Sequence, residues 1–286
     1  MNEYKIFTDS ACDLSAELLR LWGVKFCSLS FAFDGETRIY DNYELPAPVF
    51  YQFMRDGKIA RTSAINPDRF ARSFEKELKK GRDILYLGIS SPLSATFNSA
   101  QIAAEELMEK YPDRKILTVD SLGGSAGLGL LIYLVVQQKK AGASIEEAAA
   151  FAEANKLRIC HWFTTDTLTY LQRGGRIGTA AAVLGNALNL RPVLRVSEEG
   201  LLVNMAKMRG RKATIRALAD KAIKHAVDGS PIFISHADCE EDAIALAQMI
   251  RDARGLKTEV ITDVGPVIGA HAGPGTLALF FVGNER

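Results

Sequence analysis

The chain has 286 residues, of which 48% are hydrophobic and 24% charged, and its formal net charge is +1. This composition supports a buried core and excludes a disordered chain, and the balance of charge argues against general binding of polyanions. At this length we expect two α/β domains, divided into residues 1–155 and 156–286.

The first half of the sequence alternates short apolar runs with longer amphipathic ones. The apolar runs predict strands at residues 4–8, 24–33, 83–88 and 115–119. The amphipathic runs predict helices at residues 15–22, 46–55, 67–79, 94–110 and 123–141. Asp13 and Ser94 are the expected N-cap residues of two of these helices. The alternation indicates an N-terminal parallel-sheet α/β/α domain, in which ligands bind at the carboxyl ends of the strands.

Polar side chains gather where these predicted elements meet. They are Asp9-Ser10, Ser90-Ser91 and Asp120-Ser121 at the ends of three predicted strands, with Thr62-Ser63 in a predicted turn and Ser94 at the start of a helix. Each of them is also an ordinary cap or turn residue. Several such groups at one edge of a sheet favour a site for an anionic head group such as a carboxylate or a phosphate.

The second half mixes a hairpin with crossover helices. Strands are predicted at residues 159–163, 193–196, 201–208, 231–235 and 258–261. Helices are predicted at residues 144–158, 168–172, 180–188, 212–227 and 241–253. Glu198-Glu199-Gly200 reads as a hairpin turn between two of the strands, which indicates a mixed sheet. We therefore expect a C-terminal mixed-sheet α/β domain, with the ligand between the two domains.

Basic residues are concentrated in residues 156–215, which hold ten Lys and Arg against three Asp and Glu. They include Arg173 and Arg176 around a Gly-Gly turn, and a basic turn from Lys207 to Lys212. The region is either a set of solvated faces or a docking surface for an acidic partner or a phosphorylated ligand. No aromatic residues stand between the arginines, so nucleic-acid binding is the weaker interpretation.

One histidine, His271, lies in the segment Gly-Ala-His-Ala-Gly-Pro-Gly. A lone histidine is more often structural, but a loop histidine among glycines can also contact an anion. The remaining histidines and the four cysteines show no metal-ligand spacing, so we expect no metal. The glycine-rich segment 120–129 fits neither a dinucleotide nor a P-loop motif, so we expect no cofactor.

The sequence also carries signals about its compartment. No signal peptide precedes the first strand, and the most apolar stretch, residues 128–136, is far shorter than the roughly 20 residues of a membrane span. The cysteines lack disulfide-like spacing and read as reduced thiols. We therefore predict a cytoplasmic protein whose contact with membranes is at most transient.

Taken in order, several motifs resemble those of the DegV family of bacterial fatty-acid-binding proteins. These are Thr8-Asp9-Ser10 with Asp13-Leu14, Thr62-Ser63, Ser91-Pro92-Leu93-Ser94-Ala95-Thr96, Arg173-Gly174-Gly175-Arg176-Ile177, and His271-Ala272-Gly273-Pro274-Gly275-Thr276. The resemblance spans essentially the whole chain. It implies two α/β domains with a long-chain fatty acid buried between them.

The resemblance also implies roles for particular residues. Thr62, Ser94 and His271 would hold the fatty acid carboxylate, and Ser63, Ala95, Asp9 and Ser10 would support them. Family members present the acyl group to a separate ATP-binding fatty acid kinase, so Arg176 and Arg209 would face that kinase or the new phosphate. Ala95 and Ala272 stand where the family usually has glycine and threonine. Since a firmly held carboxylate would resist phosphorylation, we expect neutral donors without an arginine clamp.

Two other functions remain open at this stage. One is an enzyme, a small-molecule kinase subunit or transferase related by fold to dihydroxyacetone kinases, which would need a chemical role for His271. The other is a nucleic-acid-binding module that uses residues 173–212. The lipid carrier, which is not an enzyme itself, is the preferred interpretation because it alone accounts for the whole ordered set of motifs.

Overall fold

The first sheet of the computed structural model, which describes residues 3–178, 189–284 and 286, is entirely parallel. Its strands run in the order β2-β1-β6-β7, and they are β1 (Tyr4–Asp9), β2 (Lys25–Cys27), β6 (Asp83–Gly88) and β7 (Ile116–Asp120). All six residues of β6 are buried, as a central strand covered on both faces requires. The predicted parallel sheet is therefore confirmed.

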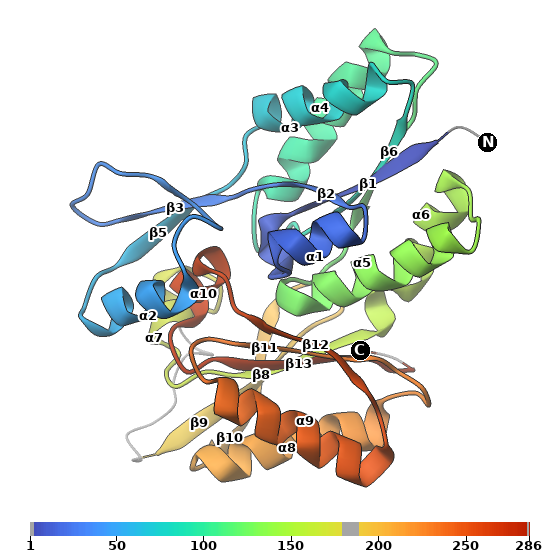
Figure 1. Ribbon diagram of the computed structural model, residues 1–286. Helices are drawn as coiled ribbons and strands as arrows, with labels where there is room; N and C mark the ends of the chain where they lie inside the picture. The colour runs from blue at the N-terminus through green and yellow to red at the C-terminus, as the bar shows by residue number, and fades with distance from the viewer. Residues whose placement is uncertain (1–2, 179–188, 285) are drawn as a thin grey trace.

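Helices cover both faces of this sheet (Figure 1). They are α1 (Ala16–Leu21), α3 (Pro67–Leu78), α4 (Thr96–Lys110), α5 (Ser125–Lys140) and α6 (Ile145–Asn155). Helix α3 starts with Pro67 behind an Asn66 cap and buries Phe70 and Phe74 one turn apart. The N-cap of α1 is Ser15, not Asp13 as predicted. Asp13 has a left-handed backbone (φ 51°) and follows the 3₁₀ turn η1 (Ser10–Cys12).

A small lobe stands apart from that sheet. It contains β3 (Ser30–Phe33), β4 (Tyr40–Asp41), α2 (Ala47–Arg55) and β5 (Ala60–Ser63). The single strand predicted at residues 24–33 is wrong, because the chain leaves the first sheet after Cys27 and enters the lobe at Ser30. The predicted turn at Thr62 and Ser63 is also wrong, since both residues pair with β3 as part of β5.

The second sheet has six strands and is mixed. Its order is β10-β9-β8-β13-β11-β12, and within the described residues β11 and β12 are its one parallel pair. The strands are β8 (Ile159–Thr164), β9 (Leu190–Val196), β10 (Leu202–Arg209), β11 (Ile232–His236), β12 (Thr258–Asp263) and β13 (Leu277–Val282). The mixed sheet and the β9–β10 hairpin confirm the sequence interpretation. Strand β13 was not predicted, and the helix predicted at 180–188 lies outside the described residues.

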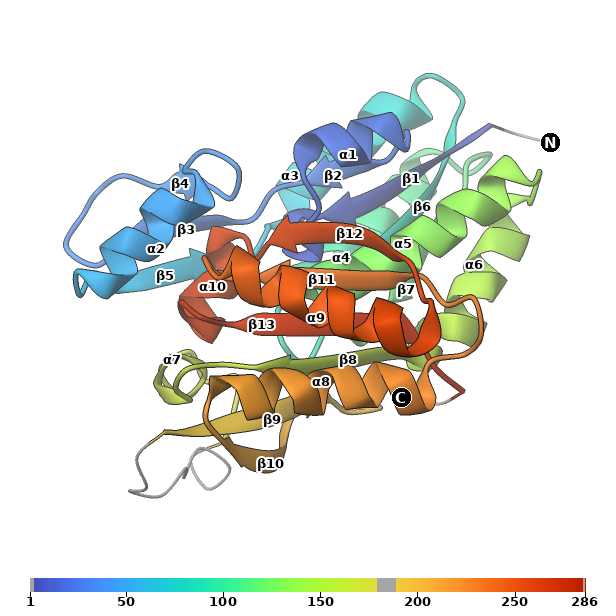
Figure 2. The same cartoon turned by 60° about the horizontal axis from the view of Figure 1, so that its bottom comes forward.

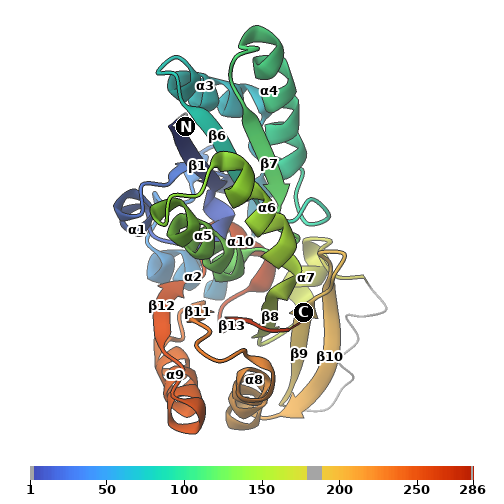
Figure 3. The same cartoon turned by 90° about the vertical axis from the view of Figure 1, so that its right-hand side faces the viewer.

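Helices α8 (Arg211–His225) and α9 (Glu240–Arg254) cover one face of this second sheet (Figure 2). Helix α5 packs against the opposite face, so it lies between the two sheets (Figure 3). Two short helices, α7 (Thr169–Arg173) and the unpredicted α10 (Pro266–Ala272), lie beside the lobe. The predicted domain boundary after residue 155 falls between α6 and the 3₁₀ turn η2 (Lys156–Arg158).

Candidate functional site

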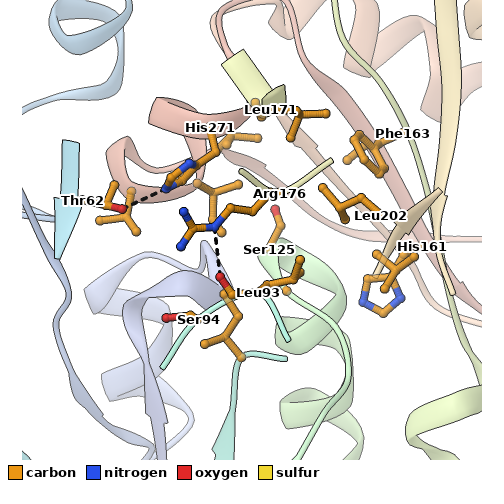
Figure 4. Close-up of a pocket in the computed structure, with 18 of the residues that line it drawn as sticks. Thr62, Leu93, Ser94, Ser125, His161, Phe163, Leu171, Arg176, Leu202 and His271 are labelled. Carbon is orange, nitrogen blue, oxygen red and sulfur yellow. Dashed lines mark hydrogen bonds between the residues drawn. The ribbon is translucent and has the colours of Figure 1, made fainter. Parts of the chain in front are cut away.

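A cavity of about 250 Å³ lies between the two sheets and the lobe. Its wall includes β5, the loop from β6 to α4, α10 and strands of the second sheet. Figure 4 shows Thr62, Ser94, Arg176 and His271 on one side of the cavity, and Phe163 and Leu202, with His161 beside them, toward the second sheet. We call these the polar end and the apolar end. The polar end contains Thr62, Ser94, Arg176 and His271.

Thr62 and His271 meet at the polar end although 209 residues separate them in sequence. Thr62 Oγ1 lies 2.8 Å from His271 Nε2, within hydrogen-bond distance. Thr62 comes from strand β5, and His271 from the last turn of α10. The lobe and the C-terminal half therefore form this end together.

The imidazole of His271 is held in a confined position. Burial, together with the nearby charge of Arg176, lowers the pKa of His271 from 6.5 to about 4, so the ring is neutral at pH 7. Its Nδ1 faces Gly174, where an added Cβ would lie 2.1 Å away. Glycine at position 174 is thus needed for the ring to fit, and a neutral ring can donate one hydrogen bond to a carboxylate without forming an ion pair.

Arg176 also lies at the polar end of the cavity, where we expected neutral donors. Its Nε donates to Leu93 O at 3.1 Å, and its Nη1 donates to Gly174 O. Burial lowers the pKa of the guanidinium from 12.5, but it stays charged at neutral pH. Two of its donors are thus committed to backbone carbonyls, and the arginine contributes a fixed positive charge beside His271.

Ser94 lies just before α4 and not at its N-cap, which is Ala95. Its Oγ lies 3.0 Å from Thr96 Oγ1 and accepts from Thr96 N at 3.3 Å. Both Ser94 and Ala95 line the cavity. The start of a 15-residue helix therefore adjoins the polar end, where its dipole favours an anion.

The apolar end is formed mainly by strands of the second sheet. Phe163, Leu202 and Phe280 come from β8, β10 and β13, and Leu171 comes from α7. The sequence alone did not identify these lining residues, because the outward or inward direction of a strand residue depends on how the sheets pack.

His161 lines the apolar end and was not recognised from sequence. Its Nδ1 lies 2.8 Å from Ile159 O, and its ring packs edge-on against Phe280. Burial holds its pKa well below 6.5, so it is neutral. Gly123 and Gly127 pack on the ring, since a Cβ on either would lie 2.2–2.3 Å from Nε2. Gly127 thus lets α5 pack closely on β8, which carries His161.

Four other predicted residues lie outside the cavity wall. Buried Asp9 accepts from Ala11 N, Ile89 N and Tyr86 Oη, and burial raises the pKa of its carboxyl group. Ser10 accepts from Leu29 N at 2.9 Å. Both residues brace the loops behind the site. Ser63 and Arg209 are exposed, on β5 and at the end of β10.

Among the described residues, no group of three or more His, Cys, Asp or Glu side chains is placed to hold a metal ion. Across the same described ranges, no helix has the length and hydropathy needed to cross a membrane. The donors at the polar end and the apolar wall of the cavity suit a molecule with one anionic end and an apolar body.

Comparison with known proteins gives consistent matches along the whole chain. The model of the DegV family, whose members are described as uncharacterised, matches residues 3–284. A DegV domain-containing protein of Clostridium perfringens is 44% identical, with 100% of this chain and 99% of the relative covered. A DegV family protein of Thermus thermophilus, described by its fatty acid binding, is 31% identical with a TM-score of 0.86 over 99% of this chain and 100% of that one. A stearic acid-binding protein of Eubacterium ventriosum is 27% identical with a TM-score of 0.88, covering 98% of each chain.

Proposed function

The chain belongs to the DegV family, and from that premise we propose that it binds a long-chain fatty acid and presents the carboxylate to a separate fatty acid kinase. The observation that carries the proposal is the division of one cavity into a polar end and an apolar end. The acyl tail occupies the apolar end, where burial contributes about 0.8 kcal/mol per CH₂. The two solved relatives described above, named for binding fatty acids, support the same class of ligand.

In this proposal the carboxylate lies among Thr62, Ser94 and His271. The hydroxyl groups and a neutral imidazole supply hydrogen bonds. Arg176 adds a positive charge near the carboxylate. Because its Nε and Nη1 already donate to backbone carbonyls, the guanidinium balances the negative charge without forming a bidentate ion pair. That arrangement orients one carboxylate oxygen for attack on the terminal phosphate of ATP, held by the kinase.

The chain itself is a carrier in this proposal, and phosphoryl transfer takes place on the partner. Arg176 at the cavity and exposed Arg209 on the same basic region would meet the kinase or the acyl phosphate. The ligand is the fatty acid, with no further cofactor. Acyl phosphate formation by the purified chain and ATP alone would overturn the carrier assignment.

The first experiment is to extract the purified full-length protein with organic solvent and identify released lipids by mass spectrometry. We expect a fatty acid at about one equivalent per chain. A protein that yields no lipid and also fails to take up added [¹⁴C]palmitate would contradict the proposal. Extraction of the Leu202→Gln variant, purified in parallel, is the control for lipid that adheres outside the cavity.

A further inference from the structure

Helix α10, which carries His271, has no capping side chain of its own. The residue at its N-cap is Gly265, and the next residue, Pro266, has no N–H. The remaining free N–H groups at the start of a helix normally bond to a Ser, Thr, Asp or Asn at the N-cap. Here those bonds come from a distant part of the chain.

Two side chains from the N-terminal half take the place of the missing cap. Asp13 Oδ1 accepts from Gly265 N at 3.0 Å, and Asn42 Oδ1 accepts from Val267 N at 2.9 Å. An ordinary capping box satisfies the N-cap N–H and an N–H of the first turn with two side chains of the same helix. The same two kinds of bond are made here across 252 and 225 residues of sequence.

Both capping residues are themselves firmly held. Asp13 and Asn42 are 4% and 3% exposed. Ser125, which lines the cavity, donates to Asp13 Oδ2 at 2.6 Å, and Asn42 Nδ2 donates to Ser10 O at 3.3 Å. A Cβ at position 265 would lie 2.9 Å from Asn42 Nδ2 and 3.0 Å from Asp13 Oδ1, so glycine leaves the space that this cap needs.

We propose that Asp13 and Asn42 are positioning residues for the head-group site, because they fix the start of α10 and thereby hold His271 against Thr62. The importance of this cap for ligand binding rests on the proposed function, but its effect on the position of His271 can be tested without a ligand. Tyr51 strengthens the same arrangement, since its hydroxyl donates to Val264 O at 2.6 Å just before the helix. Neither capping residue lines the cavity, so Asn42 acts on the head-group site through α10, and Asp13 acts through α10 and through its bond to cavity-lining Ser125.

The test compares Asp13→Ala with Asp13→Asn in the full chain. Asparagine keeps an acceptor for Gly265 N, whereas alanine removes it. The readout is the pair of imidazole ¹⁵N shifts of His271, assigned with His271→Gln and measured without ligand. We expect Asp13→Ala to shift the His271 signals and Asp13→Asn to restore them close to wild type. Folded Asp13→Ala protein with wild-type His271 signals would overturn the inference.

Asn42→Ala is the second variant, in case Asp13→Ala does not fold, and we expect it to shift the same signals. Ser230→Ala is the matched control, because Ser230 Oγ is also a buried acceptor for a backbone N–H, that of Val282 at 2.8 Å, but lies away from α10. It should leave the His271 signals unchanged, and an equal shift in this control would also overturn the inference.

A ligand experiment keeps this inference separate from the proposed function. With [1-¹³C]palmitate bound, Asp13→Ala should move or broaden the carboxyl signal while palmitate affinity changes less than threefold. If wild-type protein takes up no palmitate, the proposed function fails, yet the imidazole shifts still decide whether the cap positions His271. If palmitate binds and neither the carboxyl signal nor the His271 signals respond, the positioning role fails alone.

Discussion

The polar and apolar ends of the cavity are built in different ways. The polar end brings together β5, the loop before α4, Arg176 and α10, which meet only in the folded chain. The apolar end consists mostly of residues from β8, β10 and β13, in one sheet. A sheet places its side chains rigidly, whereas the polar end depends on contacts such as Thr62–His271 between separate units. If the proposed function is correct, we expect the sheet to supply most of the affinity and the contacts between units to orient the head group.

The energies of the two ends support this division. A tail of about sixteen carbons contributes roughly 10 kcal/mol from burial before the costs of ordering. A hydrogen bond from a hydroxyl to the charged head group contributes about 1.5–3 kcal/mol after exchange with water. The loss of one hydroxyl should therefore change affinity far less than the loss of the apolar wall.

The largest effect is expected from a polar group in the apolar end. Leu202→Gln removes apolar contact and buries an amide, so palmitate affinity should fall about 10- to 100-fold. Leu201→Gln, at the neighbouring position that is 47% exposed, is the control and should change affinity less than twofold. Equilibrium dialysis with [¹⁴C]palmitate measures both, and equal losses in the two variants would refute the assignment of the apolar end.

The double variant Thr62→Val with Ser94→Ala addresses the other end. It removes two hydroxyl groups but leaves the tail contacts, and both hydroxyls already share hydrogen bonds with His271 and Thr96, so affinity should fall only about tenfold. The bound carboxyl carbon should lose its wild-type ¹³C shift, while a label on carbon 16 of palmitate keeps its own. If the label on carbon 16 moves and the carboxyl label does not, the two ends have been assigned in the wrong order.

The sequence predicted the parts of the fold that have a local signal. Strand β6 and the β9–β10 hairpin are marked by an apolar run and a turn, and both were found where expected. Strand β5 was missed because Ala60–Ser63 alternates partly buried and exposed residues without an apolar run. Helix α10 was missed because its cap lies at Asp13 and Asn42, and no local pattern can show a cap more than 200 residues away.

The sequence predicted the head-group residues of the site, but not the place of Arg176 or the residues that line the apolar end. Thr62, Ser94 and His271 were named through the family resemblance, and the structure brings them to one cavity. The position of Arg176 within that cavity was not expected, because it depends on where the Gly174-Gly175 turn lies relative to Leu93. Tail-lining residues such as Phe163 could not be chosen from a strand that is buried along most of its length.

The low pKa of His271 gives a smaller, pH-dependent effect at the polar end. Its folded pKa of about 4 lies below the ordinary 6.5, so the unfolded chain takes up the proton first as the pH falls. The resulting stability is present above pH 6.5 and lost between pH 6.5 and 4. Between pH 6.5 and 4 the free energy of unfolding should fall by about 1 kcal/mol more in wild type than in His271→Gln. This is less than the full pKa shift implies, because the imidazole is partly exposed and solvent screens its charge. Urea denaturation at each pH measures this, and parallel curves for the two proteins would show that the ring is not desolvated.

The smallest effect is expected at Arg209, which lies in the basic region but not in the cavity. Its side chain is exposed at the end of β10, so Arg209→Gln should change palmitate affinity less than twofold. Arg176→Gln should weaken binding more, because it removes the positive charge beside the carboxylate from within the cavity wall. Equilibrium dialysis at two salt concentrations compares the two variants. If Arg209→Gln weakens palmitate binding as much as Arg176→Gln does, the head group extends beyond the polar end toward the protein surface. If only Arg176→Gln weakens palmitate binding, Arg209 does not help to retain the ligand, as expected of a residue that contacts the kinase.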